Sequence, residues 1–153
     1  MEITRRLVME DDVDLLVGWH NDPDTLPYWD YEEYTPETMR AKLAEPNLER
    51  WIILEGGEPV GYLQHWWEPG SRTAGLDGFL IPSARGRGVM PVAARQLARE
   101  LLEDRFDEVT VDPYLWNERA LRGWAKGGFV EDSRHQPDEE HTAEWVLMRF
   151  VES

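Results

Sequence analysis

Hydrophobic and polar residues follow one another along the chain in two patterns, one typical of strands and the other of helices. Alternating or continuous apolar runs predict seven strands, at residues 3–8, 50–54, 60–67, 75–81, 108–111, 129–131 and 144–151. Apolar positions three and four residues apart predict four helices, at residues 13–20, 36–45, 89–104 and 119–126. This order predicts an α+β, or mixed α/β, fold: a central, twisted, mainly antiparallel sheet of six to seven strands with helices on both faces.

Residues that favour turns and caps mark the ends of several predicted elements. Thr35 is suited to cap the second helix, and Asn117 to cap the last one, because their side chains can accept a hydrogen bond from a free N–H. The segment 55–58, with two adjacent glycines, predicts a hairpin turn. Two longer segments are expected to be loops. Residues 26–34 are dense in aromatic and acidic side chains, and residues 132–141 are polar.

Composition narrows the class of protein. The 153 residues fit one domain, expected over 1–153. The absence of cysteine excludes disulfides, zinc–thiolate sites and a cysteine nucleophile. The four histidines lack the spacing of metal ligands, so no metal site is expected. No apolar run is long enough to cross a bilayer and the N-terminus lacks a signal-peptide pattern, so we expect a cytoplasmic protein without a membrane partner.

The charge balance is strongly acidic, with 31 Asp and Glu against 16 Lys and Arg and a formal net charge of −15. Such a chain repels phosphate backbones, so nucleic acid is not an expected partner. A polycationic substrate would be attracted, although acidity that only maintains solubility is an equal interpretation. The eight tryptophans suit a pocket wall for sugar rings or cations, and they also suit ordinary core packing.

The stretch 75–90 carries the clearest chemical signal. An apolar strand leads into a turn that contains Arg85, Gly86, Arg87 and Gly88, and a helical pattern follows. A glycine-rich turn that opens a helix points backbone N–H groups at one spot, where the helix dipole favours an anion such as phosphate. The two arginines add charge and forked donors. The alternative is a plain strand–turn–helix with solvated arginines.

This turn resembles the acetyl-coenzyme A signature of the GNAT superfamily of N-acetyltransferases, Arg/Gln-x-x-Gly-x-Gly/Ala. Arg85 and Gly88 fit it, and Met90 stands where Gly or Ala is usual. A second block, Asn-x-x-Ala-x-x-x-Tyr-x-x-x-Gly-Phe, is matched from Asn117 to Phe129 at the family spacing. The resemblance implies acetyl-coenzyme A as cofactor. It implies cofactor contacts from the following residues: Phe79, Leu80, Ile81, Arg85, Gly86, Arg87, Gly88, Val89, Met90, Asn117 and Trp124.

Within that superfamily the chain is most similar to the aminoglycoside 6'-N-acetyltransferases, in the hairpin 57–64, in residues 75–80 and in the pair Asp112-Pro113. The resemblance implies that Asp77 acts near the acceptor amine, that Asp112 holds amino groups and that Gln64 lies in the substrate cleft. It also implies that aromatic residues of the loop 26–34 stack on a sugar; these are Tyr28 and Trp29.

The expected reaction is direct attack of an amine on the thioester. Asp77 is the candidate that positions or deprotonates the amine, and backbone N–H groups of the fourth strand can polarise the carbonyl. The alternative for Asp77 is a strand-edge aspartate that bonds the backbone. In the family a tyrosine often protonates the leaving thiolate, but Trp124 occupies its position. Tyr114 is the nearby candidate donor, and water or substrate are the alternatives.

Three functions are open on this sequence. The first is acetylation of a small-molecule amine like the aminoglycoside 6'-amine. The second is acylation of a siderophore hydroxylamine or a protein N-terminus, suggested by the helix end Trp19–Asp22. The third is a non-catalytic acyl-coenzyme A-binding module, suggested by Met90 and Trp124. We expect a monomer or a homodimer.

Overall fold

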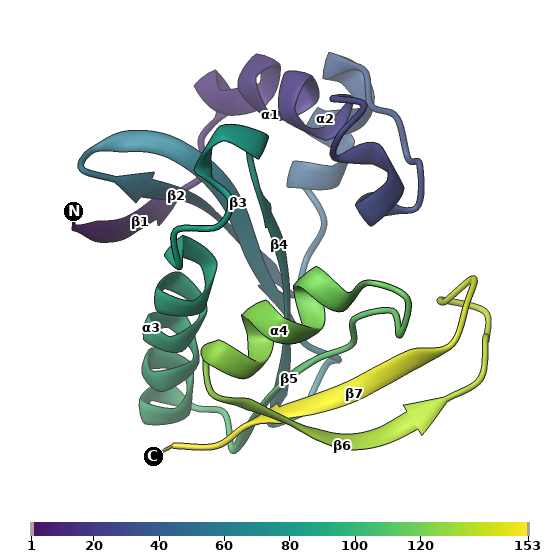
Figure 1. Cartoon of the computed structure of the whole chain (residues 1–153). Coiled ribbons are helices and arrows are strands. Elements are labelled where there is room, and N and C mark those ends of the chain that lie inside the picture. The colour runs from purple at the N-terminus through teal and green to yellow at the C-terminus, as the bar shows by residue number, and fades with distance from the viewer. Residues whose placement is uncertain (1, 153) are drawn as a thin grey trace.

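Seven strands form one sheet, in the order β1-β2-β3-β4-β5-β7-β6 (Figure 1). The computed structural model describes residues 2–152. The strands are β1 (Ile3–Leu7), β2 (Leu48–Glu55), β3 (Glu58–Trp66), β4 (Thr73–Leu80), β5 (Glu108–Val111), β6 (Phe129–His135) and β7 (Trp145–Phe150). All neighbouring pairs are antiparallel except β4 and β5, which are parallel. The predicted mainly antiparallel sheet is therefore confirmed.

Helices cover both faces of this sheet, as predicted (Figure 1). They are α1 (Val13–His20), α2 (Pro36–Leu43), α3 (Val89–Asp104) and α4 (Glu118–Lys126). Successive residues of a strand point to opposite faces, and the two cores follow this alternation. Ile53 and Leu63 pack in the core beneath α3, whereas their neighbours Ile52 and Tyr62 pack beneath α1 and α2. Among residues 2–152, none of the helices has the length and apolar character needed to cross a lipid bilayer.

Local signals place the helix starts. The Thr35 hydroxyl accepts a hydrogen bond from the Thr38 N–H at 3.1 Å, and α2 begins directly after it. The Asn117 side chain accepts from the Ala120 N–H at 3.2 Å and caps α4. In contrast, α3 begins after Gly88 (φ +76°) with no side-chain cap. The first N–H groups of α3 are therefore left for another partner.

Several predicted boundaries differ from the structure; β3 and β4, for example, each begin two residues before the predicted start. The expected loop 132–141 is wrong at its start, because β6 continues to His135 through a register shift between Glu131 and Ser133. Most side chains of β6 are exposed, so backbone pairing with β7 extends the strand without any alternation of apolar residues. Strand β2 begins at Leu48, two residues before the predicted start. In the loop 26–34, residues 26–29 form a short 3-10 turn.

The sheet opens between β4 and β5. These strands pair only where residues 73–75 meet residues 108–110. After β5 the chain follows β7 instead, and the Pro113 carbonyl accepts from the Val146 N–H at 2.9 Å. In the described part of the chain, the remainder of β4 pairs with β3 alone. A gap therefore lies beside the second half of β4.

Gly78 lies in this half of β4, where neighbouring atoms leave no room for a side chain. A Cβ at this position would stand 2.5 Å from the Tyr62 carbonyl oxygen and 3.1 Å from the Met90 methyl group. The backbone of β3 can approach this closely only because residue 78 is glycine.

We predict that Gly78→Ala destabilises the protein by about 1–3 kcal/mol, because the added methyl group forces β3 and β4 apart. Gly18→Ala is the matched control: it lies in α1 with no atom within 4 Å of the new methyl group. That variant should gain up to about 1 kcal/mol, since alanine favours the helix. Urea unfolding of the three proteins measures both effects, and equal midpoints would contradict the packing described here.

Candidate active site

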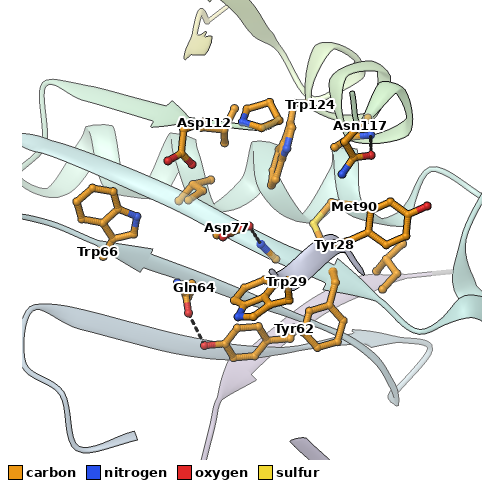
Figure 2. Close-up of a pocket in the computed structure, with 18 of the residues that line it drawn as sticks. Tyr28, Trp29, Tyr62, Gln64, Trp66, Asp77, Met90, Asp112, Asn117 and Trp124 are labelled. Atoms are coloured by element: carbon orange, nitrogen blue, oxygen red, sulfur yellow. Dashed lines mark hydrogen bonds between the residues drawn. The ribbon is translucent and has the colours of Figure 1, made fainter. Parts of the chain in front are cut away.

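A cavity of about 1000 Å³ opens where β4 and β5 part (Figure 2). Strands β3 and β4, the loop 26–34, the turn before α3 and one side of α4 line it. Most of the residues that the sequence singles out meet here: Tyr28, Trp29, Gln64, Asp77, Phe79, Leu80, Arg85, Gly86, Gly88, Val89, Met90, Asp112, Tyr114, Asn117 and Trp124. Segments from all parts of the chain thus contribute to one site.

Ile81 and Arg87 are the two predicted cofactor contacts that do not line the cavity. The Ile81 N–H continues the pairing with β3, donating to the Val60 carbonyl at 2.9 Å. The Arg87 guanidinium pairs with Glu55 and donates to the Ser83 carbonyl. Both residues are held by contacts within the protein, and their cofactor role stays a prediction.

Asp77 occupies the centre of the cavity, half-buried on β4 (Figure 2). Its Oδ1 accepts a hydrogen bond from the Gly78 N–H at 2.8 Å. Burial, the nearby Asp112 carboxylate and, more weakly, Asp30 raise the pKa of Asp77 to about 8, although the Gly78 N–H and His141 act in the opposite direction. At neutral pH this carboxyl group therefore holds a proton much of the time.

Asp112 follows the last residue of β5 and faces Asp77 across the opening. Its Oδ2 lies 2.7 Å from Nε2 of His141, a residue of the β6–β7 connection that the sequence analysis does not identify. The other ring nitrogen of His141 lies 2.8 Å from Oδ1 of Asp138. Neither the spacing nor the composition of residues 132–141 indicates that His141 contacts Asp112, because the position of His141 depends on how far β6 extends.

Two aromatic groups line the cavity. In the first group, Tyr28 and Tyr114 line the cavity and both contact Trp116, which stacks on Tyr114 and is tilted by 34° against Tyr28, with centroids 5.7 Å apart in each pair. The Tyr114 hydroxyl donates to Asp30 at 2.7 Å. The loop 26–34 is thereby joined to the segment after β5. Because the Tyr114 hydroxyl is already bonded to Asp30, its role as the catalytic proton donor stays a prediction.

The second aromatic group forms the floor of the cavity. Trp29 meets Tyr62 and Phe79 edge-on, with ring centroids 6.0 and 5.5 Å away. His20 is buried among these rings, and burial lowers its pKa to about 4, so it is neutral. The Tyr62 hydroxyl donates to Oε1 of Gln64 at 2.6 Å, which fixes the orientation of the Gln64 amide (Figure 2).

The other end of the cavity is basic. Arg85 and Arg119 both lie over the ring of Tyr28, with guanidinium carbons 5.8 and 5.2 Å from its centroid. Burial and the charge of Arg119 lower the pKa of Arg85. In the described part of the chain, no carboxylate lies within 4.0 Å of either guanidinium group. Arg122 and Lys126 add two more cations from the same side of α4.

The turn before α3 adds uncapped N–H groups to this basic end. Gly86 and Gly88 have φ values of +82° and +76°, which glycine adopts without strain. Within residues 2–152, the backbone N–H groups of 86–90 have no hydrogen-bond acceptor. A helix start with free N–H groups, beside guanidinium groups that have no carboxylate partner in the described residues, is suited to a phosphate or diphosphate.

Met90 and Trp124, the two residues that differ from the family motifs, both line the cavity and leave it open. The Met90 methyl group lies against the backbone at Gly78, where no side chain is present. Trp124 is buried and meets Phe129 edge-on at 5.6 Å. Its indole is only a hydrogen-bond donor, so it cannot exchange a proton as a tyrosine does.

Comparison with known proteins decides the family. Residues 8–136 match the acetyltransferase (GNAT) domain family. The chain belongs to the GNAT acetyltransferase family. It is therefore an acyltransferase, and its GNAT signature, residues 85–90, lies between β4 and α3 as the sequence predicts.

Similar GNAT proteins include the aminoglycoside N(6')-acetyltransferases type 1 of Klebsiella pneumoniae and Serratia marcescens. Each is 30% identical over 149 residues, covering 83% of this chain and 73% of the relative. The solved structure of AAC(6')-Ib with paromomycin and acetyl-coenzyme A superposes with a TM-score of 0.85 at 25% identity, covering 99% of this chain and 94% of that one. The AAC(6')-Ib complex with coenzyme A and kanamycin gives 0.84 at 26% identity, covering 98% and 95%.

Proposed function

We propose that the protein transfers an acetyl group from acetyl-coenzyme A to an amine of an aminoglycoside-like, polycationic acceptor. The observation that carries this proposal is one cavity with a basic end, an acidic end and a carboxyl group, Asp77, between them. The curated relatives are aminoglycoside N(6')-acetyltransferases, and the similar solved structures hold coenzyme A or acetyl-coenzyme A together with aminoglycosides.

The basic end has the donors that the cofactor requires. The free N–H groups of residues 86–90, with Arg85 and Arg119 beside them, are suited to the diphosphate. When bound, acetyl-coenzyme A supplies the thioester that the amine attacks. Phe79 and Leu80 of β4, with Asn117 and Trp124 across the opening, border the path from this turn to Asp77.

The acidic end has the charges that a polycationic acceptor requires. Asp30, Asp112 and Glu140 line the cavity on the Asp77 side. Arg50, a buried cation that also lines the cavity, lies 3.8 Å from Glu45. Aromatic rings at the same end offer flat faces to sugars and cations. This charge favours an amine over a neutral hydroxylamine.

Asp77 is placed to move the proton of the acceptor ammonium. A carboxylate with a pKa near 8 is a stronger base than an ordinary aspartate, so removal of an ammonium proton is less unfavourable. The neutral acid that results can return this proton to the departing sulfur, a step for which Trp124 has no exchangeable proton to offer. The negative charge of Asp112 helps by keeping Asp77 basic.

The remaining properties stay predictions. We expect a cytoplasmic monomer or homodimer, and we expect no nucleic-acid partner because the net charge is −15. In a bacterium that meets aminoglycosides, the proposed reaction would confer resistance, because acetylation removes a positive charge from the drug.

We predict that the protein releases free thiol from acetyl-coenzyme A in the presence of kanamycin. Asp77→Asn should lower kcat by at least about 100-fold, because the base is lost, while the Kd for acetyl-coenzyme A changes less than about twofold. Thiol release and calorimetry measure the two quantities. Lack of turnover with a panel of aminoglycosides and polyamines, despite tight acetyl-coenzyme A binding, would overturn the proposed function.

We predict that kcat/KM rises as the pH increases through about 8, because Asp77 must lose its proton before it can accept one from the acceptor. The acceptor amine titrates as well, so two acceptors whose reacting amines differ in pKa are compared. The rise that both profiles share belongs to the enzyme. A profile that stays flat down to pH 6 would show that Asp77 is not the base.

We predict that Arg85→Ala weakens acetyl-coenzyme A binding about tenfold, which corresponds to about 1.4 kcal/mol. Arg87→Ala is the matched control, since this side chain is bound to Glu55 outside the cavity, and should change the Kd less than about threefold. Calorimetric titration with acetyl-coenzyme A measures both constants. Equal losses in the two variants would mean that both arginines contact the cofactor.

A further inference from the structure

His141 stands between two carboxylates, and the geometry fixes its charge. Nδ1 lies 2.8 Å from Oδ1 of Asp138 and Nε2 lies 2.7 Å from Oδ2 of Asp112. A carboxylate only accepts hydrogen bonds, so both contacts are hydrogen bonds only when both ring nitrogens carry hydrogen. The imidazolium satisfies this requirement. In a neutral ring, one nitrogen lone pair would face a carboxylate oxygen.

The contacts around the ring hold it in this position. Asp138 is itself fixed: its Oδ1 also accepts from the Glu140 and His141 N–H groups, at 3.0 and 2.9 Å. Its Oδ2 accepts from the Trp145 indole at 3.1 Å. The imidazole stacks on Trp145 with centroids 4.1 Å apart and planes 12° apart, a geometry that favours a cation.

The groups that face His141 come from four places in the fold. Asp112 approaches from the end of β5, and Tyr114 meets the ring edge-on at 6.0 Å. Asp138 belongs to the β6–β7 connection that contains His141 itself, and Trp145 belongs to β7. Across the opening lies Asp77 on β4, and the charge of the His141 ring lowers the pKa of Asp77. The nearest ionised groups are therefore negative.

Burial lowers the pKa of His141, but hydrogen bonds to Asp138 and Asp112 outweigh the effect of burial and raise this pKa overall.

We propose that His141, as an imidazolium, is a positioning residue that holds Asp112 and acts as the internal counter-ion of the Asp77–Asp112 pair, limiting how strongly the site prefers polycationic over monocationic amines. This inference rests on the proposed function. The acceptor's second ammonium group competes with an imidazolium already bound to Asp112. The same charge limits how far the pKa of Asp77 rises, so a larger fraction of Asp77 is ionised at neutral pH than would be without it.

The first test uses the wild-type protein without acceptor. The imidazole signals of His141, assigned in isotope-labelled wild-type protein through their through-bond correlations to the His141 backbone, are followed by NMR between pH 5 and 9. We expect His141 to titrate above the ordinary value of about 6.5 and to be protonated at pH 7. A neutral ring at pH 7 would overturn the inference. This result does not depend on turnover, so it stands apart from a failure of the proposed function.

The second test compares His141→Gln with wild type. Glutamine keeps an N–H donor for Asp112 but carries no charge. We expect the ratio of the diamine KM to the monoamine KM, measured at one pH, to fall by about threefold or more, because only the diamine has a second ammonium group that meets the uncompensated Asp112. The acidic limb of kcat/KM should move up by about half a pH unit, because Asp77 loses a counter-ion.

The matched control is His135→Gln. His135 stacks on the opposite face of Trp145, at 4.2 Å and 15°, and bonds Ser133 rather than Asp112. It should leave both the selectivity and the pH profile unchanged. The inference would be overturned if His141→Gln acetylated its acceptors with the same selectivity and pH profile as wild type. It would also be overturned if His135→Gln shifted both properties as much as His141→Gln does. Either result would leave the proposed function intact. Should His141→Gln fail to fold, the wild-type titration still decides the matter.

Discussion

The structure depends on the early end of pairing between β4 and β5. After residue 75 the two strands share no ladder, because the chain beyond β5 turns to β7 at Pro113. Backbone groups that would normally bond a neighbouring strand then face a cavity, and the Gly78 N–H bonds the Asp77 carboxyl instead. The gap gives β4 a free edge inside the protein, and the proposed site surrounds that edge, with Asp77 on β4 and Asp112 and Trp124 across the opening (Figure 2).

The gap also creates an electrostatic difficulty, because it brings carboxyl groups together in a half-buried place. Two adjacent carboxylates cannot both ionise freely away from bulk water. Two features reduce the repulsion between these carboxyl groups. Asp77 has a pKa of about 8 and is therefore mostly protonated at neutral pH, and Asp112 is hydrogen-bonded to the His141 ring. At the opposite end, Arg85 and Arg119 remain without carboxylate partners in the described chain, so the field runs from positive to negative along one cavity.

Much of this architecture could be predicted from the sequence, since its signals are local. Thr35 and Asn117 cap helices where expected, and the glycine-rich turn lies between β4 and α3. What could not be predicted depends on long-range pairing. His141 reaches Asp112 only because β6 runs further than its polar residues indicate. Arg85 and Arg87 look alike in sequence, yet only Arg85 lines the cavity.

The centre of the site lies on a strand and its walls lie on loops, and this arrangement has a consequence for how the enzyme can evolve. The centre of the site stands on β4, where Gly78 tolerates no added atom. The walls that would meet an acceptor come from residues 26–34, the segment after β5 and the β6–β7 connection, which are separate in sequence. Each wall can therefore change by insertion or substitution while the strand remains as it is. The same catalytic centre can serve new amines without a new fold.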